Sequence, residues 1–153
     1  VARIARNYFA LRATELLRVH VRDAVEYVKQ PQEPYDYILL DAYDADDLPD
    51  ALATPSFFRD VRRLLDEEDG VVVVNIAIRG AVRTDAMIRT LTSTFGNCFH
   101  LRSPPSLNDI LVLALKPLPE TDSVLARLSE LGVSHSIRNH VRAQLTAAQP
   151  CVV

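Results

Sequence analysis

A short apolar run that ends in an acid does most to limit the folds open to this chain. Residues 36–41, DYILLD, have the length and composition of a buried strand, and Asp41 is the last of them. A loop rich in carboxylates follows, and then a helical pattern. Because ligands of open α/β sheets bind outside the carboxyl ends of the strands, Asp41 is the first candidate for a functional residue.

Strand and helix patterns alternate along the rest of the chain. The β-branched run at 71–76 indicates a strand buried on both faces, as in parallel sheets. The helix at 55–65 has Thr54 as its cap and a proline at its first position. Three aromatic side chains are expected in the core: Phe57, Phe58 and Phe95.

The remaining predicted elements are a helix at 1–8, a strand at 17–21, a helix capped by Asp23, a helix at 84–95, strands at 98–102 and 109–116, and two helices after 117. The short loop between the last two strands favours a hairpin. This order predicts a doubly wound α/β sheet, mostly parallel with an antiparallel last strand. Residues 1–116 would form it, and residues 117–153 would be a helical extension of the same domain.

Composition excludes several classes of function. The 153 residues fit one domain, and a net charge of −3 without a Lys/Arg block argues against nucleic-acid binding. The longest apolar run, 71–78, is too short to cross a bilayer, so no membrane partner is expected. Cys98 and Cys151 lie far apart, which suits a reducing compartment better than a disulfide scaffold, and a cytoplasmic location is expected. All four glycines are isolated, so the chain has no glycine loop for phosphate or nucleoside.

Most other polar residues have simpler interpretations. His20 and His100 alternate with apolar strand residues and are expected to be exposed. No grouping of His and Cys provides enough ligands for zinc, so no metal site is predicted. Three acids of the loop after Asp41 are expected to be solvated: Asp46, Asp47 and Asp50.

Five segments in this order resemble the spermidine synthase-like family, including its methyltransferase-like relatives. They are VARIARNYF, LRVHVRDAVEYV, YDYILLDAYDADDLP, TPSFFRDVRRLL and DGVVVVNI. The resemblance implies the Rossmann-like sheet of class I S-adenosylmethionine-dependent methyltransferases. It also implies S-adenosylmethionine or its decarboxylated form as co-substrate, without a metal.

The resemblance assigns roles to four residues. Asp23 and Ala24 match the positions that contact the adenine of the nucleoside. Asp41 and Asp44 match the family's D-x-x-D motif. Its first acid lies against the donor, orients the attacking amine and accepts its proton, whereas the second holds the polyamine.

Departures from the family pattern leave the transferred group open. Ala42 and Ala45 stand where the synthases have Ser and Pro, and Asn75 occupies the region of a family Gln. This pattern is similar to the methyltransferase-like branch. Aminopropyl or methyl transfer to an amine is therefore expected, with methyl transfer to a protein or another small molecule as an alternative. A non-catalytic interaction module derived from this fold is the other alternative.

In the family's strand order, 3-2-1-4-5-7-6, the first two strands, the glycine loop and the ribose-binding acid would precede Val1. The chain would then be a C-terminal portion with at most half of the nucleoside pocket, and we expect it to be inactive by itself. Strands 17–21 and 36–41 would each keep an unpaired edge, which is costly and prone to aggregation. An N-terminal segment, a partner chain or a swapped copy in a homodimer is expected to complete the sheet.

Overall fold

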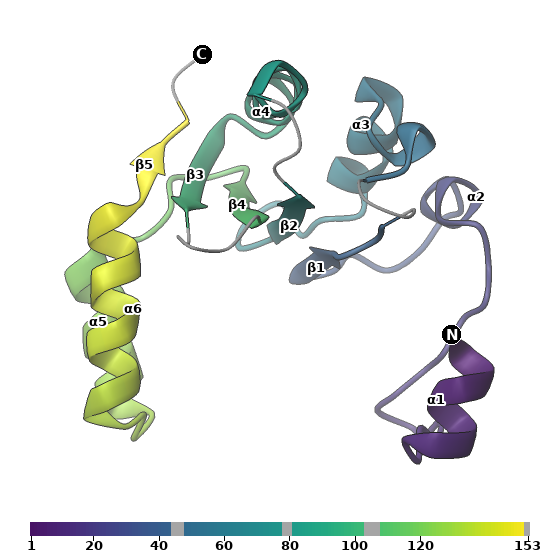
Figure 1. The fold of residues 1–153 in the computed structure, drawn as a ribbon, viewed down its shortest axis with the longest axis horizontal. Helices are drawn as coiled ribbons and strands as arrows, with labels where there is room; N and C mark the ends of the chain where they lie inside the picture. The colour runs from purple at the N-terminus through teal and green to yellow at the C-terminus, as the bar shows by residue number, and fades with distance from the viewer. Residues whose placement is uncertain (44–47, 78–80, 103–107, 152–153) are drawn as a thin grey trace.

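The computed structural model describes residues 1–43, 48–77, 81–102 and 108–151 (Figure 1). The helices are α1 (Ala2–Tyr8), α2 (Ala24–Val28), α3 (Pro55–Arg63), α4 (Ala81–Phe95), α5 (Thr121–Glu130) and α6 (His135–Ala147), with a 3-10 turn η1 (Asp50–Leu52). The strands are β1 (Tyr37–Leu40), β2 (Val71–Ala77), β3 (Asn97–Arg102), β4 (Asn108–Ala114) and β5 (Gln149–Pro150).

The strands form one mixed sheet in the order β1-β2-β4-β3-β5. β1 and β2 are parallel, and β4 lies antiparallel between β2 and β3, so β1, β2 and β3 run in the same direction. The predicted α/β sheet and its antiparallel last strand are confirmed. The order β1-β2-β4-β3 corresponds to 4-5-7-6 of the family's sheet.

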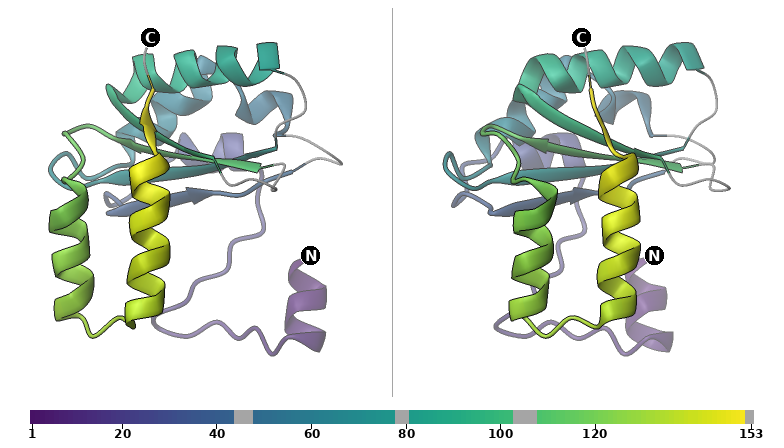
Figure 2. Two further views of the ribbon diagram at one scale, coloured as in Figure 1. Left: turned by 60° about the vertical axis from the view of Figure 1, so that its left-hand side comes forward. Right: turned by 90° about the vertical axis from the view of Figure 1, so that its left-hand side faces the viewer.

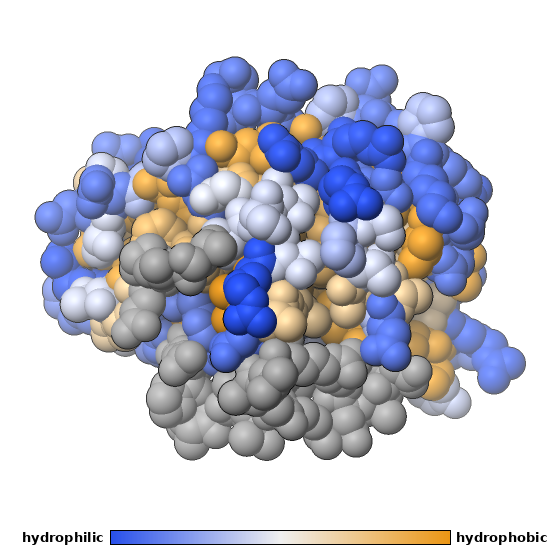
Figure 3. All heavy atoms as spheres, turned by 90° about the horizontal axis from the view of Figure 1, so that it is seen from above, coloured by the Kyte–Doolittle hydropathy of each residue, from blue (hydrophilic) through white to orange (hydrophobic). Residues whose placement is uncertain are grey.

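Helices α3 and α4 cover one face of the sheet (Figure 2). The buried residues there come from β2 and β4 and from the two helices, and Phe57, Phe58 and Phe95 lie among them as predicted. Figure 3 shows this side from above, with hydrophilic residues around its outer rim and hydrophobic residues between them. Thr54 caps α3 by accepting a hydrogen bond from Phe57 N at 3.2 Å, which confirms the start predicted from sequence.

The opposite face is only partly covered. Phe99, Leu101 and Val112 on the β3–β4 half line a cavity together with residues of α5 and α6. On β1, however, Tyr37 and Leu39 are each 72% exposed. The expectation that residues 71–76 are buried on both faces was wrong, because Val71, Val73 and Asn75 are only half-buried. No helix of the described residues covers this half of the sheet.

The strand expected at 17–21 does not form. Residues 9–23 are irregular, and Leu17 and Val21 are 44% and 74% exposed. A strand is stable only when its backbone groups pair with a neighbour, and within the described residues this segment has no neighbouring strand. Nor does it pair with β1. A direct pairing of these two segments would have contradicted the family's strand order.

Cys98 and Cys151 are joined in a disulfide, with Cα atoms 5.2 Å apart. The expectation that these two residues are not joined in a disulfide was therefore wrong. Distance along the sequence was misleading, because β5 returns the chain to the edge of β3 after 53 residues. None of the helices in the described part of the chain has the length and apolar character of a membrane span.

Candidate active site

Asp41 directly follows β1 and lies at the carboxyl end of the parallel pair. Pairing of Leu40 with Val74 brings the next residues, Asp41 and Asn75, side by side. Asn75 Nδ2 donates a hydrogen bond to Asp41 Oδ1 at 2.9 Å. The sequence alone pointed to Asp41. The contact with the Asn75 amide, which holds one of its carboxylate oxygens, follows from the strand register.

The Asp41–Asn75 pair combines an accessible carboxylate with a buried amide oxygen. Asp41 is exposed, so its carboxylate is accessible from outside. Asn75 Oδ1 is buried, and it lacks a hydrogen-bond partner among the residues that the structure describes. Buried polar atoms are rarely left without a hydrogen bond. The unpaired Asn75 Oδ1 beside the accessible Asp41 carboxylate therefore makes this pair a candidate site.

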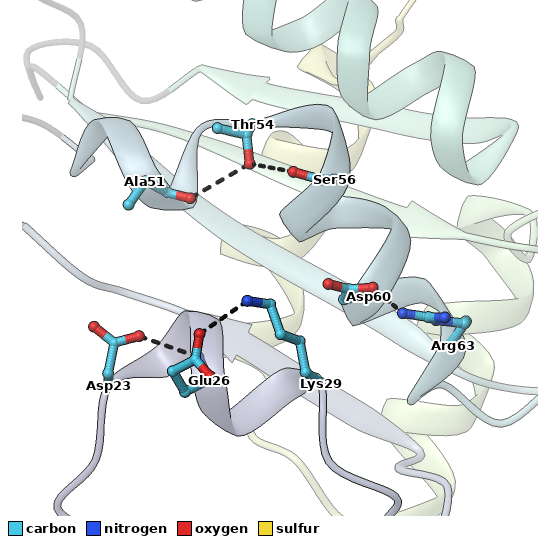
Figure 4. Close-up of polar contacts among 8 residues, drawn as sticks. All are labelled: Asp23, Glu26, Lys29, Ala51, Thr54, Ser56, Asp60 and Arg63. Atoms are coloured by element: carbon cyan, nitrogen blue, oxygen red, sulfur yellow. Dashed lines mark hydrogen bonds and ion pairs between the residues drawn. The ribbon is translucent and has the colours of Figure 1, made fainter.

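Asp23 and Ala24 lie at the N-terminus of α2. Asp23 is its N-cap and accepts a hydrogen bond from Glu26 N at 3.1 Å, whereas Glu26 pairs with Lys29 one turn later (Figure 4). The predicted cap is confirmed. However, Asp23 does not follow a strand, since residues 17–21 form none.

A groove of about 330 Å³ lies between α2, β1 and α3. It runs beside the unpaired edge of β1, and its lining includes Ala24, which follows Asp23, and Leu40, which precedes Asp41. Its other walls come from α2, β1 and α3 and are mainly apolar or aromatic, with Tyr27, Tyr35, Phe57 and Val61 among them. The structure thus brings the neighbours of two predicted site residues to one groove.

Two tyrosines fix one end of this groove. The hydroxyl groups of Tyr27 and Tyr35 lie 3.1 Å apart, and Tyr35 donates to Gln32 Oε1 at 2.6 Å. Gln32 Nε2 in turn donates to the carbonyl oxygen of Tyr27 at 3.0 Å. The hydrogen bond to Tyr27, together with partial burial, raises the pKa of Tyr35. This network was not predicted, although the sequence places Tyr27 and Tyr35 on either side of Pro31 and Pro34.

The acidic loop after Asp41 is described only in part. Asp44, Asp46 and Asp47 lie outside the described residues. Asp50 is exposed in η1, and the chain returns to the core at Leu48. Within residues 1–43, 48–77, 81–102 and 108–151, no group of three or more His, Cys, Asp or Glu side chains could hold a metal ion.

A second polar pair was missed by the sequence analysis. His100 was expected to be exposed, but it is only 7% exposed, and its Nε2 lies 2.5 Å from Oδ2 of Asp109, which is 2% exposed. His100 and Asp109 come from β3 and β4 and meet on the buried face because these strands pair antiparallel. The predicted hairpin was the available signal, because it places these two strands side by side.

Comparison with known proteins supports the family resemblance. No family model matches the chain. It is 32% identical to a polyamine aminopropyltransferase of Neisseria meningitidis, with 98% of this chain and 58% of that protein aligned. It is 27% identical to one of Vibrio vulnificus, with 100% of this chain and 48% of that protein aligned. The chain therefore spans about half the length of these relatives.

Two solved structures share the fold. Human methyltransferase-like protein 13, in complex with SAH, has a TM-score of 0.69 at 19% identity, covering 95% of this chain and 65% of that one. A probable spermidine synthase from Corynebacterium glutamicum has a TM-score of 0.69 at 20% identity, covering 83% of this chain and 50% of that one. Sheet order and these neighbours define the chain as part of a class I methyltransferase fold. In sequence it is similar to polyamine aminopropyltransferases, of which it spans about half the length.

Proposed function

We propose that this chain is the C-terminal part of a transferase that uses an S-adenosylmethionine-type donor and an amine acceptor. The observation that carries the proposal is the Asp41–Asn75 pair at the carboxyl end of β1 and β2. Relatives that cover the chain are named polyamine aminopropyltransferases, and one structural neighbour was solved with SAH. A location at the carboxyl ends of parallel strands is where α/β proteins bind their ligands.

Asp41 has the properties of an orienting group and proton acceptor. In the reaction, a neutral amine attacks the carbon next to the sulfonium of the donor. A C–N bond forms while the C–S electron pair returns to sulfur, and the amine's proton passes to the carboxylate. The hydrogen bond from Asn75 holds one carboxylate oxygen, which leaves the other to accept a hydrogen bond from the amine. Asp44 is proposed as a second contact to the acceptor.

The groove beside β1 suits the nucleoside of the donor. Apolar and aromatic walls fit a flat base, and Ala24 leaves room at the end where Asp23 lies. Asp23 Oδ1 accepts from Glu26 N, and the carboxylate keeps a further oxygen for a donor group on the base. The donor would supply a transferable methyl or aminopropyl carbon bound to sulfur. Asp23, Ala24 and Asp41 are the residues that we propose to hold it.

Aminopropyl and methyl transfer remain two forms of this proposal. Names of the sequence relatives favour aminopropyl transfer to a polyamine. Ala42 and Asn75, which depart from the synthase pattern, favour the methyltransferase-like branch and its protein or small-molecule acceptors. A non-catalytic module of the same fold is the alternative from a different class.

The deciding experiment is an assay of the protein at its natural length. Product formation is measured by mass spectrometry with decarboxylated and with ordinary S-adenosylmethionine, each with a diamine acceptor. We expect one donor to support turnover, and Asp41→Asn to lower kcat by about 100-fold or more, because general-base contributions are of that size. Binding of S-adenosylhomocysteine should remain within about threefold of the wild type, because one of several contacts changes.

Two matched variants complete the test. Asp50→Asn makes the same chemical change in the same acidic loop and should retain turnover. Asp23→Ala should weaken nucleoside binding. Absence of both turnover and nucleoside binding in the wild-type protein would overturn the proposal in favour of a non-catalytic module, and an Asp41→Asn enzyme with normal kcat would remove Asp41 from its role.

We also propose that a further segment or a partner chain completes the sheet at β1. The outer edge of β1 pairs with no strand of the described residues. Beside it lie the groove and the exposed side chains of Tyr37 and Leu39. An added strand would satisfy the backbone groups of this edge. Because all four residues of β1 line the groove, this strand would fill the part along β1 and leave the end near Ala24 and Leu40 for the nucleoside.

A further inference from the structure

We propose that the Cys98–Cys151 disulfide is a redox-sensitive latch that holds the C-terminal segment, α6 and β5, on the edge of β3. Cys98 lies in β3, and Cys151 follows β5 directly. Besides the covalent bond, Cys151 N donates to the carbonyl oxygen of Cys98 at 2.9 Å. Figure 1 shows β5 leading from the end of α6 along β3.

Without the disulfide, the contact of β5 with the sheet is small. Only two residue pairs join β5 to β3 within the described chain, Phe99 with Pro150 and His100 with Gln149. Proline cannot donate to a strand ladder, which weakens this short pairing further. A two-residue strand at an edge is not stable by itself, so the covalent bond is the main restraint on this segment.

The latch also restrains one wall of a cavity. A space of about 240 Å³ lies between the half-covered face of the sheet and the helices α5 and α6. Phe99 and Val112 line it from the sheet, and Leu145 lines it from the last turns of α6, just before β5. Release of β5 would loosen this end of α6 and admit water to apolar surface that the segment now covers.

The two sulfur atoms differ in accessibility, and this difference determines which of them a reductant attacks. Cys98 is 5% exposed in the core, whereas Cys151 is half-buried at its border. A thiolate from a dithiol reductant would attack Sγ of Cys151, forming a mixed disulfide and releasing the Cys98 thiolate, which takes up a proton. The second thiol of the reductant then attacks the reductant's first sulfur atom in the mixed disulfide and releases the thiolate of Cys151. Two electrons pass from the reductant to the protein, and the reductant becomes a disulfide.

Reduction is expected to open the latch locally. Cys98 can remain in the core as a small apolar side chain, so the sheet under α3 and α4 is retained. The edge of β3 that faces β5 would lose its partner. The result is a protein with an intact main core, a released β5 and a loosened end of α6.

Hydrogen exchange of the protein at its natural length tests the latch. Exchange is followed by mass spectrometry with and without a dithiol reductant, after thiol titration of both forms. We expect no free thiol at these two positions in the oxidised form. On reduction, exchange should become at least about tenfold faster in peptides covering 145–151 and the edge of β3, with little change in α3 and β2.

A Cys151→Ser variant is the matched control. It should show fast exchange in the same peptides without reductant and no further change when reductant is added. Treatment with a large excess of a monothiol should give a mixed disulfide at Cys151 and not at Cys98, as seen by peptide mapping. Free thiols at both positions after air oxidation, unchanged exchange on reduction, or equal acceleration throughout the molecule would each overturn the latch.

Discussion

At the scale of single residues, His100 and Asp109 form the most buried polar contact of the described chain. Their nitrogen and oxygen are 2.5 Å apart under α4, and Asp109 Oδ1 has no hydrogen-bond partner among the described residues. In a buried pair of this kind, each side chain provides the hydrogen-bond partner of the other. Removal of either would leave a polar group buried without that partner. The pair therefore links β3 and β4 on the buried face of the sheet.

A double-mutant cycle measures this dependence. Asp109→Leu removes the acceptor and leaves the His100 imidazole buried without it, and we expect a loss of about 3 kcal/mol in the free energy of unfolding. His100→Leu should cost a comparable amount. The double variant should cost less than the sum of the two by more than about 1 kcal/mol, measured by urea denaturation. Additive losses would show that the two side chains act independently.

At the scale of elements, the turn between α3 and β2 depends on Asp66. Its Oδ1 accepts hydrogen bonds from the backbone amides of Glu68 and Asp69, each at 2.9 Å. These bonds, that from Asp69 first, lower the pKa of the Asp66 carboxyl. Gly70 closes the turn, because a Cβ there would lie 2.4 Å from the carbonyl oxygen of Asp66.

The lowered pKa gives the turn a pH dependence of known sign. Because the folded-state pKa of Asp66 lies below its unfolded value, its contribution is complete above about pH 4 and is lost as the pH falls through the folded pKa. Asp66→Asn should lower the thermal midpoint at pH 7 and reduce its decline as the pH falls below about 4. Asp69→Asn, a neighbour in the same turn, should retain the wild-type decline. Identical pH profiles for Asp66→Asn and wild type would contradict this role.

At the scale of the whole molecule, one edge of the sheet is covered and the other edge is open. β5 covers the edge of β3, whereas the edge of β1 is bare within the described residues. Tyr37 and Leu39 extend that open region onto the uncovered face. Unpaired strand edges next to exposed apolar side chains favour pairing with another chain.

We expect residues 1–153, expressed alone, to self-associate at micromolar concentration through this edge. Leu39→Lys should weaken the association, measured by analytical ultracentrifugation, and should change the stability by less than about 0.5 kcal/mol because the side chain is already exposed. Ile137→Lys, at an exposed apolar position of α6, is the control and should leave the association unchanged. A monomeric wild-type chain, or equal effects of both variants, would argue against the open edge as the contact.

The sequence by itself determined the elements whose signals are local. Thr54 and Pro55 set the start of α3, Asp23 caps α2, and the β-branched run forms β2, because caps and side-chain periodicity act within a few residues. It also determined that Asp41 lies at the carboxyl end of a strand, directly after β1. The order of these elements carried the family resemblance, which the relatives confirm.

Only the tertiary structure decided the features that depend on partners distant in sequence. Asn75 meets Asp41 because two strands pair in one register, and Cys151 meets Cys98 because β5 returns to β3. His100 is buried because Asp109 lies beside it across the hairpin. Residues 17–21 have the pattern of a strand and remain irregular, since a strand needs a neighbour to hydrogen-bond, and a pattern of side chains along one segment cannot supply that neighbour.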